Sequence, residues 1–484
     1  MGALRAALCV WAMAATCGAQ VPAATGATKL STADREMARS IFKQLIEINT
    51  TDSVGSVTTA AEAMRRRLLD AGYAPADVVV AGPNARKGNM VAHLRGRPGS
   101  TAKPVLMICH LDVVEARRED WTTDPFDFTE KDGYFYGRGT QDMKDSDAAM
   151  VMSFIRMKRE GFVPDRDLIL ALTADEEGGK SNGVDWLLKN RHELMDAEFV
   201  LNPDAGGLTA KGGVPLLFAV EATEKLYADY HVTATNPGGH SSLPTPNNAI
   251  YHVADALARL EQKPFPFELN EVTRAELGER AKLATGQEAD DLRAVLRPQP
   301  ELAAIERLSA NPVYNATMRT TCVATMISGG HAPNALPGSA TANVNCRILP
   351  GHSQEQVRQE LIGIFADPTL KVEYTTDAGE VLGKGSDRAA APPPPLLPAV
   401  FTPLRATVAS MWPGLPIVPE METGASDSIY TMAAGLPSYG FNGMAIEQGD
   451  ERAHGRDERL GVEAFYAGVE FQYRYLKAMA SAPR

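Results

Sequence analysis

The stretch Val105–Asp112 reads VLMICHLD, an unbroken apolar run that ends in a histidine and an aspartate. Two further runs of this kind are Leu168–Glu177, LILALTADEE, and Phe199–Asp204, FVLNPD. Short continuous apolar runs are typical of strands buried on both faces, as in a parallel sheet. In open sheets of this class, ligand-binding side chains follow the carboxyl ends of the strands. The three runs therefore predict an α/β fold with a polar site at one edge of its sheet.

Helical patterns lie between and beyond these runs, so strands and helices alternate along the first half of the chain. Apolar residues at three- and four-residue spacing, such as Ile41, Leu45 and Ile48, predict a helical stretch over 32–69. Further strands are expected at 78–80 and 90–94, and further helices at 147–159 and 183–190. Alternation of strands and helices implies a sheet with parallel members.

After about residue 222 the expected elements follow the order β-α-β-β-α-β, which is that of a ferredoxin-like module. The strands are expected at 226–235, 321–327, 342–349 and 370–375, and the helices at 248–260 and 354–365. An acidic, partly helical stretch at 263–310 separates the first of these helices from the second strand. The α/β pattern then resumes, with a helix at 403–411, a strand at 417–421 and a helix at 462–478.

A chain of 484 residues is long enough for more than one domain. The simplest organisation is one discontinuous α/β domain into which a second domain is inserted. The expected segments are the first domain at 30–222 and 398–484, the inserted domain at 223–376 and a proline-rich linker at 377–397.

The first 24 residues have the pattern of a signal peptide. A lone Arg5 precedes the apolar run 6–15, and small residues follow at 17–19. That run is too short for a transmembrane helix, and no later stretch is long and apolar enough for one. Export to the periplasm or secretion is therefore expected. Lipid attachment at Cys17 is less favoured, because Thr16 is bulkier than the residue that usually precedes a lipidated cysteine.

Composition narrows the classes of protein and partner. Apolar residues make up 44% and charged residues 22%, which is a globular balance rather than a disordered or fibrous one. The net charge of −12 argues against a nucleic-acid partner, because phosphate binding requires a basic surface.

Cys322 and Cys346 lie in two strand-like runs, and an oxidising compartment would permit a disulfide between them. The sequence leaves that pairing open.

The first candidate site residues are His110 and Asp112. In extended chain, positions i and i+2 face the same way, so Asp112 can hydrogen-bond the far imidazole nitrogen of His110. A buried polar pair at the end of a strand is the alternative.

The next motif, Gly137–Asp142, reads GRGTQD, and its glycines permit a sharp turn. Asp142 then precedes a helix, where it could equally be an N-cap.

Three adjacent carboxylates, Asp175–Glu177, follow the second apolar run. Such a cluster is costly beside a buried strand unless metal or solvent neutralises it. Adjacent side chains point apart, so one can bind metal while its neighbour acts as a general base; a solvated acidic turn is the alternative. Asp204 and His454 are unremarkable singly. Jointly, these imidazoles and carboxylates suit zinc, and a two-metal site also needs a bridging oxygen ligand.

The motifs HLDVV at 110–114, GRGTQDMK at 137–144 and DEEG at 175–178, together with Trp121 and Asp124-Pro-Phe126, resemble a family of co-catalytic zinc hydrolases. That family includes carboxypeptidase G, carnosinase-type dipeptidases, aminoacylase and succinyl-diaminopimelate desuccinylase, and the resemblance extends over about residues 34–478. It implies two zinc ions per subunit and a cis peptide after Asp142, although Met143 stands where many members have a second aspartate. The implied roles are one zinc on His110 and Asp204, the other on Glu177 and His454, Asp142 bridging both, Asp112 orienting His110, and Glu176 as general base and acid.

The inserted domain resembles the lid and dimerisation domain of the same family. By resemblance, His240 in NPGGH would polarise the scissile carbonyl, in many dimeric members from the opposite subunit. Asn334 and Arg347 resemble residues that hold a substrate carboxylate, and a planar guanidinium suits such bidentate binding; an ordinary exposed charge is the alternative for Arg347. Gly424, in GASD at 424–427, resembles a glycine whose backbone lines the substrate site.

The resemblance implies hydrolysis of a peptide or related amide bond by the catalytic domain. Asp204 and Arg347 favour an exopeptidase or dipeptidase that acts on small peptides. An N-acyl-amino-acid amidohydrolase is the alternative, and a non-catalytic zinc-binding scaffold is a remote one. A homodimer through the lid would bring His240 to a second subunit, although the extra residues at 263–310 could instead let one chain complete its own site.

Overall fold

The three apolar runs form neighbouring strands of one sheet in the computed structural model, which describes residues 30–376, 379–387 and 389–481. The strands are β3 (Val105–His110), β6 (Leu168–Thr173) and β7 (Phe199–Leu201). β3 pairs in parallel with β6 on one side and with β7 on the other. The full strand order is β1-β2-β6-β3-β7-β18, with β1 (Val78–Ala81), β2 (Asn89–Leu94) and β18 (Ser438–Tyr439). The predicted signal peptide and residues 377, 378 and 388 of the predicted linker lie outside the described residues.

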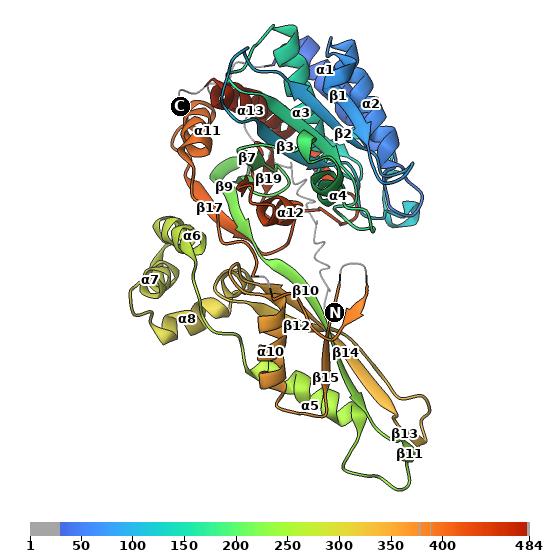
Figure 1. Ribbon diagram of the computed structural model, residues 1–484. Coiled ribbons are helices and arrows are strands. Elements are labelled where there is room, and N and C mark those ends of the chain that lie inside the picture. Colours follow the sequence, from blue (N-terminus) through green and yellow to red (C-terminus); the bar gives the residue numbers. More distant parts are fainter. Residues whose placement is uncertain (1–29, 377–378, 388, 482–484) are drawn as a thin grey trace, which may run out of the picture.

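Helices cover both faces of this sheet, as the two-sided burial of β3 requires (Figure 1). Val105, Met107 and Cys109 join a core with the helices α1 (Thr32–Glu47), α2 (Val57–Asp70), α3 (Lys144–Arg159) and α13 (Val462–Ala480). Leu106 and Ile108 face the other way, toward α4 (Gly183–Asn190). The alternation of side chains along one strand thus builds two apolar layers.

The stretch 32–69 holds two helices rather than the single helical stretch predicted. The chain leaves α1 after Glu47 and re-enters a helix at Val57. Between them, the amide N–H of Gly55 donates to the carbonyl of Thr51 at 3.0 Å, and a Cβ at Gly55 would lie 2.4 Å from the Thr51 nitrogen. This close approach of backbone is accessible to glycine alone.

A second sheet ties the two sequence halves of the first domain together. Its order is β17-β9-β8-β19, with β8 (Gly207–Lys211), β9 (Val214–Glu224), β17 (Ile417–Glu422) and β19 (Ala445–Glu447). β9 pairs in parallel with β17, and it then continues through Lys225 directly into β10 (Leu226–Thr235) of the inserted domain. A small sheet of β4 (Thr129–Lys131), β5 (Tyr134–Tyr136) and β20 (Arg459–Gly461) completes this part.

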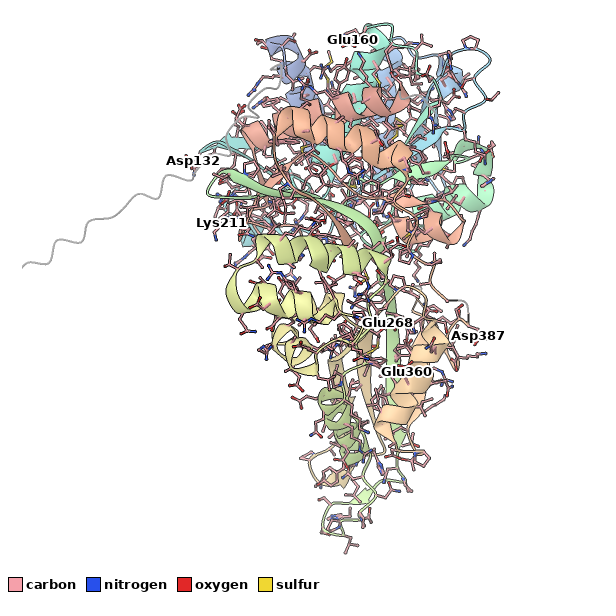
Figure 2. All side chains as sticks on the ribbon, turned by 90° about the vertical axis from the view of Figure 1, so that its left-hand side faces the viewer. Asp132, Glu160, Lys211, Glu268, Glu360 and Asp387 are labelled. Carbon is pink, nitrogen blue, oxygen red and sulfur yellow. A yellow bond between two sulfur atoms is a disulfide. The ribbon has the colours of Figure 1, made fainter. Side chains whose placement is uncertain are left out.

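The inserted domain has the predicted βαββαβ order. Its elements are β10, α5 (Ala249–Gln262), β12 (Thr321–Gly329), β14 (Ser339–Ile348), α10 (Gln354–Phe365) and β15 (Lys371–Thr375). The antiparallel sheet runs β12-β14-β10-β15-β16, where β16 is Val381–Leu382. Cys322 and Cys346 face each other across β12 and β14 and form a disulfide. This domain projects away from the first one. In Figure 2, Glu160 is labelled at the far end of the first domain and Glu360 within the inserted domain.

The acidic stretch between α5 and β12 forms four helices with their own small core, and they lie beside the junction of the two domains (Figure 1). They are α6 (Glu271–Leu283), α7 (Gly286–Val295), α8 (Leu302–Ser309) and α9 (Pro312–Thr317). Arg280 of α6 contacts Glu420 of β17 at 2.5 Å, so the insertion touches the first domain. Among the described helices, none is long and apolar enough to cross a bilayer.

Candidate metal centre

Six acidic and imidazole side chains meet at the carboxyl edge of the six-stranded sheet. They come from the ends of β3, β6 and β7, from the start of α3 and from a loop before β20: His110, Asp142, Glu176, Glu177, Asp204 and His454. Parallel strands that end at one edge bring such residues together, which is why segments far apart in the sequence converge here. The last of them, on the loop, is the most remote in sequence.

Asp142 lies between the two histidines. Its Oδ1 is 3.0 Å from Nε2 of His110, and its Oδ2 is 3.0 Å from Nε2 of His454. One carboxylate therefore faces both imidazoles through separate oxygens, which is the arrangement of a bridging ligand in a two-metal site. The peptide bond that follows, Asp142–Met143, is cis, as the resemblance implies.

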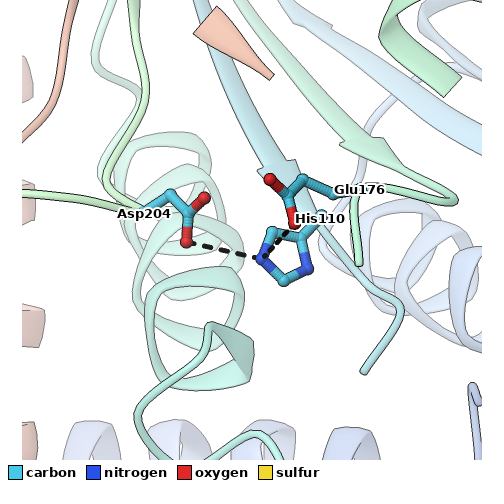
Figure 3. Close-up of side chains that lie close together, drawn as sticks. All are labelled: His110, Glu176 and Asp204. Atoms are coloured by element: carbon cyan, nitrogen blue, oxygen red, sulfur yellow. Dashed lines mark ion pairs between the residues drawn. The ribbon is translucent and has the colours of Figure 1, made fainter. Parts of the chain in front are cut away.

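Each histidine has a second carboxylate of its own. Asp204 Oδ1 is 3.4 Å from Nε2 of His110, and Glu177 Oε2 is 2.8 Å from Nε2 of His454. Figure 3 shows Asp204 and Glu176 directed at the same ring nitrogen of His110 from different sides. The cluster thus divides into two half-sites, His110 with Asp204 and Glu177 with His454, and Asp142 lies between them.

The donor atoms fit metal ions better than they fit one another. The Nε2 atom of His110 is buried and has no aligned hydrogen bond to any described residue, although carboxylate oxygens surround it. Oε1 of Glu177 is likewise buried without a partner among the described residues. Two groups of three donor atoms, on His110, Glu176 and Asp204 and on His110, Asp142 and Glu177, each lie within 4.8 Å of one another. Nitrogen and carboxylate oxygen donors at this spacing suit divalent metal ions.

The electrostatics of the cluster favour positive charge at its centre. Burial alone would lower the pKa of His110, but the charge of Asp204 and the contact with Asp142 raise it well above its ordinary value. Contacts with Asp142 and Glu177 raise the pKa of His454 to about 10. Burial would raise the pKa of Asp142, but the two histidines hold it below its usual range. Divalent cations supply the charge that the carboxylates stabilise.

Glu176 stands apart from the other carboxylates. Its Oε2 is 4.0 Å from Nε2 of His110, farther than the oxygens of Asp142 and Asp204. Burial, opposed by His110 and reinforced by the negative charges of Asp204 and Asp427, raises the pKa of Glu176 to about 10. Divalent cations bound beside this carboxyl would lower that pKa, so that the group could take a proton from water and release it again, as a general base and acid does.

Asp112 orients the site through different atoms from those predicted. The far nitrogen of His110, Nδ1, donates to the backbone carbonyl of Asp112 at 3.0 Å, whereas the Asp112 carboxylate is 3.9 Å away. The predicted carboxylate bond is therefore wrong in its acceptor, although the tautomer it fixes is the same and leaves Nε2 free for metal. The carboxylate instead accepts the amide N–H groups of Glu176 at 3.2 Å and Glu177 at 3.0 Å.

The turn that carries Glu176 and Glu177 is anchored by a buried ion pair that the sequence alone does not reveal. Asp175 has a positive φ of 60°, and its carboxylate contacts the ammonium group of Lys87. Its other oxygen accepts the amide N–H of Ser181 at 3.1 Å, and Lys87 also contacts Asp52 at 2.6 Å. Lys87 lies in a loop between β1 and β2, so no local pattern links it to Asp175.

The loop that contains Gly424 lies at the same edge of the sheet. Asp427, at its end, is buried and accepts hydrogen bonds from Asn182 at 2.6 Å and from Thr173, the last residue of β6, at 3.3 Å. Burial raises the pKa of Asp427 to about 7. Asp427 belongs to the motif GASD at 424–427, but no role for this residue was predicted from the sequence.

Two predicted lid residues lie far from the metal cluster. His240 is exposed in β11 (Gly239–His240), which pairs with β13 (Ala335–Leu336), and Asn334 precedes that strand. Figure 1 places β11 and β13 at the end of the inserted domain that is remote from β3. A single chain in this conformation therefore does not bring His240 or Asn334 to the cluster.

Arg347 has a local partner. It lies in β14 opposite Tyr227 of β10, and its guanidinium is 4.7 Å from the centre of that ring. Lys225 lies at the junction of the domains. Burial, together with the positive charge of Arg347, lowers the pKa of Lys225 to about 7. The structure places Arg347 at the base of the inserted domain rather than at the metal cluster.

A largely apolar groove of about 670 Å³ lies between the two domains. α12 (Ser428–Ala433) begins one residue after Asp427 and forms one wall. The groove is lined by residues that include Glu224, Leu226, Ala390, Pro392, Ile429 and Met432. Glu224 also accepts the amide N–H of Ser426 at 2.7 Å, which connects the groove to the loop that contains Gly424.

The α/β sheet, the inserted domain and the two half-sites that share Asp142 define a metal-dependent hydrolase of amide bonds. Residues 106–478 match peptidase family M20/M25/M40, and the chain belongs to this family.

Curated relatives extend the family assignment. The chain is 28% identical to probable carboxypeptidase S-like 2 of Dictyostelium discoideum, over 78% of this chain and 71% of that protein. It is 28% identical to the N-fatty-acyl-amino acid synthase/hydrolase PM20D1 of Homo sapiens, over 80% and 76%. It is 26% identical to aminoacylase-1 of Mus musculus, over 78% and 80%.

Solved structures share the fold at low sequence identity. An M20 family metallo-carboxypeptidase from Sulfolobus solfataricus matches with a TM-score of 0.65 and 16% identity, over 92% of this chain and 99% of that one. The dipeptidase Dug1p from Saccharomyces cerevisiae matches with a TM-score of 0.62 and 17% identity, over 93% and 97%.

Proposed function

We propose that this protein is an exopeptidase or dipeptidase that cleaves small peptides with two zinc ions. The observation that carries the proposal is the position of Asp142, whose two oxygens each lie 3.0 Å from a different histidine. His110 and Asp204 would hold one ion, Glu177 and His454 the other, and Asp142 both. Bound there, the ions would supply the positive charge that polarises the scissile carbonyl and lowers the pKa of water.

Glu176 is the proton carrier in this mechanism. It takes a proton from the attacking water and delivers it to the nitrogen of the leaving amine. Asp112 accepts the amide N–H groups of Glu176 and Glu177, and Lys87 contacts the preceding Asp175, so the backbone that carries Glu176 is held on both sides. A base that is fixed in place lowers the entropic cost of reaching the transition state.

A second copy of the chain is proposed to complete the substrate site. The edge strand β12 has unpaired backbone on its outer side and exposes Val323, Met326 and Ile327, each at least 60% accessible. An exposed apolar edge strand is a template for pairing with another chain. Light scattering tests this: wild type is expected to be a dimer and Ile327→Lys a monomer, whereas a monomeric wild type would refute it.

A second candidate function is hydrolysis of N-acyl amino acids, and the apolar groove favours it. Leu226, Ile429 and Met432 give the groove a surface that suits an acyl chain or an apolar side chain. The similarity to an N-fatty-acyl-amino acid synthase/hydrolase and to aminoacylase-1 supports the same candidate. Both candidates require the same metal cluster.

Two measurements test these proposals. Elemental analysis of the purified protein is expected to find two zinc ions per chain, and a chain that binds none would refute the metal-dependent mechanism. A panel of dipeptides, longer peptides and N-acyl amino acids separates the two candidates, because greater kcat/KM for N-acyl amino acids would overturn the exopeptidase proposal.

Export to the periplasm or beyond is also proposed, and the disulfide between Cys322 and Cys346 supports it. Cell fractionation with amino-terminal sequencing of the mature chain tests the export.

A further inference from the structure

Among the candidate ligands, His454 has the most exposed side chain. Its side chain is 57% exposed, whereas the side chains of the other residues in the cluster are less than 20% exposed. It also has a positive φ of 61°, an uncommon conformation for a residue other than glycine. The loop on which it stands must therefore be held by contacts outside the metal cluster.

Glu458, in the same loop, provides the central contact. Its buried carboxylate accepts the amide N–H groups of Gly139 at 3.1 Å, Gln141 at 2.7 Å and Asp142 at 3.2 Å. It also pairs with the buried guanidinium of Arg138 at 2.6 Å. One carboxylate thus fixes the turn that presents Asp142 relative to the loop that presents His454.

Arg138 and Gln141 extend the connection along the loop. Arg138 donates to the carbonyl of Gly455 at 2.9 Å, immediately after His454. The side-chain oxygen of Gln141 accepts the amide N–H groups of Arg452 at 2.7 Å and Ala453 at 3.2 Å, immediately before it. His454 is therefore bracketed on both sides by bonds from the turn 137–142. We call the side chains of Arg138, Gln141 and Glu458 the loop clamp.

We propose that Glu458, through the loop clamp, is a positioning residue that sets the place of His454 and thereby the retention of the metal ion shared by Glu177 and His454. The proposal rests on the two-metal function above. A buried carboxylate with four donors is costly to disturb, because each donor would be left without a partner. The ion on His110 and Asp204 depends on the clamp only through the shared ligand Asp142, whereas the ion on Glu177 and His454 depends on it through Asp142 and His454. The clamp therefore affects the second ion more.

Glu458→Gln keeps the size of the side chain but replaces one accepting carboxylate oxygen with an NH2 group, which donates hydrogen bonds and cannot accept them. Wild type is expected to bind two zinc ions per chain in chelator-buffered zinc, whereas Glu458→Gln holds one tightly and binds the other about 10- to 100-fold more weakly, as for other residues that support metal ligands. Glu470→Gln is the matched control, because the buried Glu470 also pairs with an arginine, the partly buried Arg156, at 2.8 Å between α13 and α3. That variant is expected to keep two ions at wild-type affinity.

A double variant separates positioning from a general loss of structure. His454→Ala is expected to weaken the same ion, and adding Glu458→Gln to it is expected to weaken that ion by less than Glu458→Gln does alone. Gln141→Ala asks the same question without a change of buried charge if Glu458→Gln does not fold. Two ions at wild-type affinity in either clamp variant, or independent effects of Glu458→Gln and His454→Ala, would overturn the proposal. Fewer than two ions in wild type would overturn the two-metal function and the proposal together.

Discussion

Replacing Lys87 with methionine removes the cation that contacts the buried carboxylate of Asp175. The Lys87 side chain is 9% exposed and that of Asp175 is 1% exposed, so water cannot replace the lost ammonium group. Leaving one partner of a buried pair uncompensated costs about 3–5 kcal/mol. The second partner, Asp52, is 59% exposed and adds at most about 1 kcal/mol. Because Ser181 still donates to Asp175, we expect a loss near 3 kcal/mol in the free energy of unfolding.

Urea unfolding of the metal-free protein measures this loss. Lys43→Met is the control, because Lys43 pairs with Glu47 on the surface of α1 and such pairs contribute about 0.5 kcal/mol or less. Lys87→Met combined with Asp175→Asn removes both charges, and asparagine tolerates the positive φ at this position. The double variant should therefore regain much of the lost stability. A loss below about 1 kcal/mol for Lys87→Met, or no recovery in the double variant, would refute the reasoning.

Three further predictions concern the base, the metal and pH. Glu176→Gln should keep its metal content but lower kcat by about 10²- to 10⁴-fold, and full activity with metal bound would exclude Glu176 as the proton carrier. Removal of metal with a chelator should abolish activity and lower the midpoint of thermal unfolding, both restored by zinc; hydrolysis that persists without metal would contradict the mechanism. Hydrogen bonds from Arg358 lower the pKa of Glu355 to about 2, so its contribution to stability is full above its ordinary pKa near 4.5 and is lost as pH falls through 2. The stability difference between wild type and Glu355→Gln should shrink over that range, and a constant difference would argue against it.

Elements with one dominant pattern were predictable from the sequence. α4, β10 and α10 have the predicted bounds, because a regular spacing fills the whole element. β9 was not predicted, although it is 11 residues long, because Pro215 and the buried Glu221 and Glu224 interrupt its apolar character. The loop that contains Gly424 accounts for Glu224, whose carboxylate accepts the amide N–H of Ser426.

The candidate site was predictable as a set of residues but not as a geometry. Four of the converging side chains follow strand ends, which the sequence indicates: His110, Glu176, Glu177 and Asp204. The roles of all six as ligands or base stay predictions. The contributions of Lys87 and Glu458 depend on loops that meet only in the folded chain. The distance of His240 from the cluster depends on the angle between two domains, which no local pattern encodes.

β9 continues through Lys225 into β10, so the direction of the inserted domain depends on the backbone at Lys225. Lys225 is buried and donates to the carbonyl of Arg319 at 2.7 Å, which marks a pivot. β10 has 10 residues and, at about 3.3 Å per residue, forms an arm of about 33 Å. A turn of about 20° at the pivot would sweep the far end of that arm through about 11 Å, by the same strand geometry. A small difference in backbone angle beside Lys225 would thus change the width of the gap between the domains.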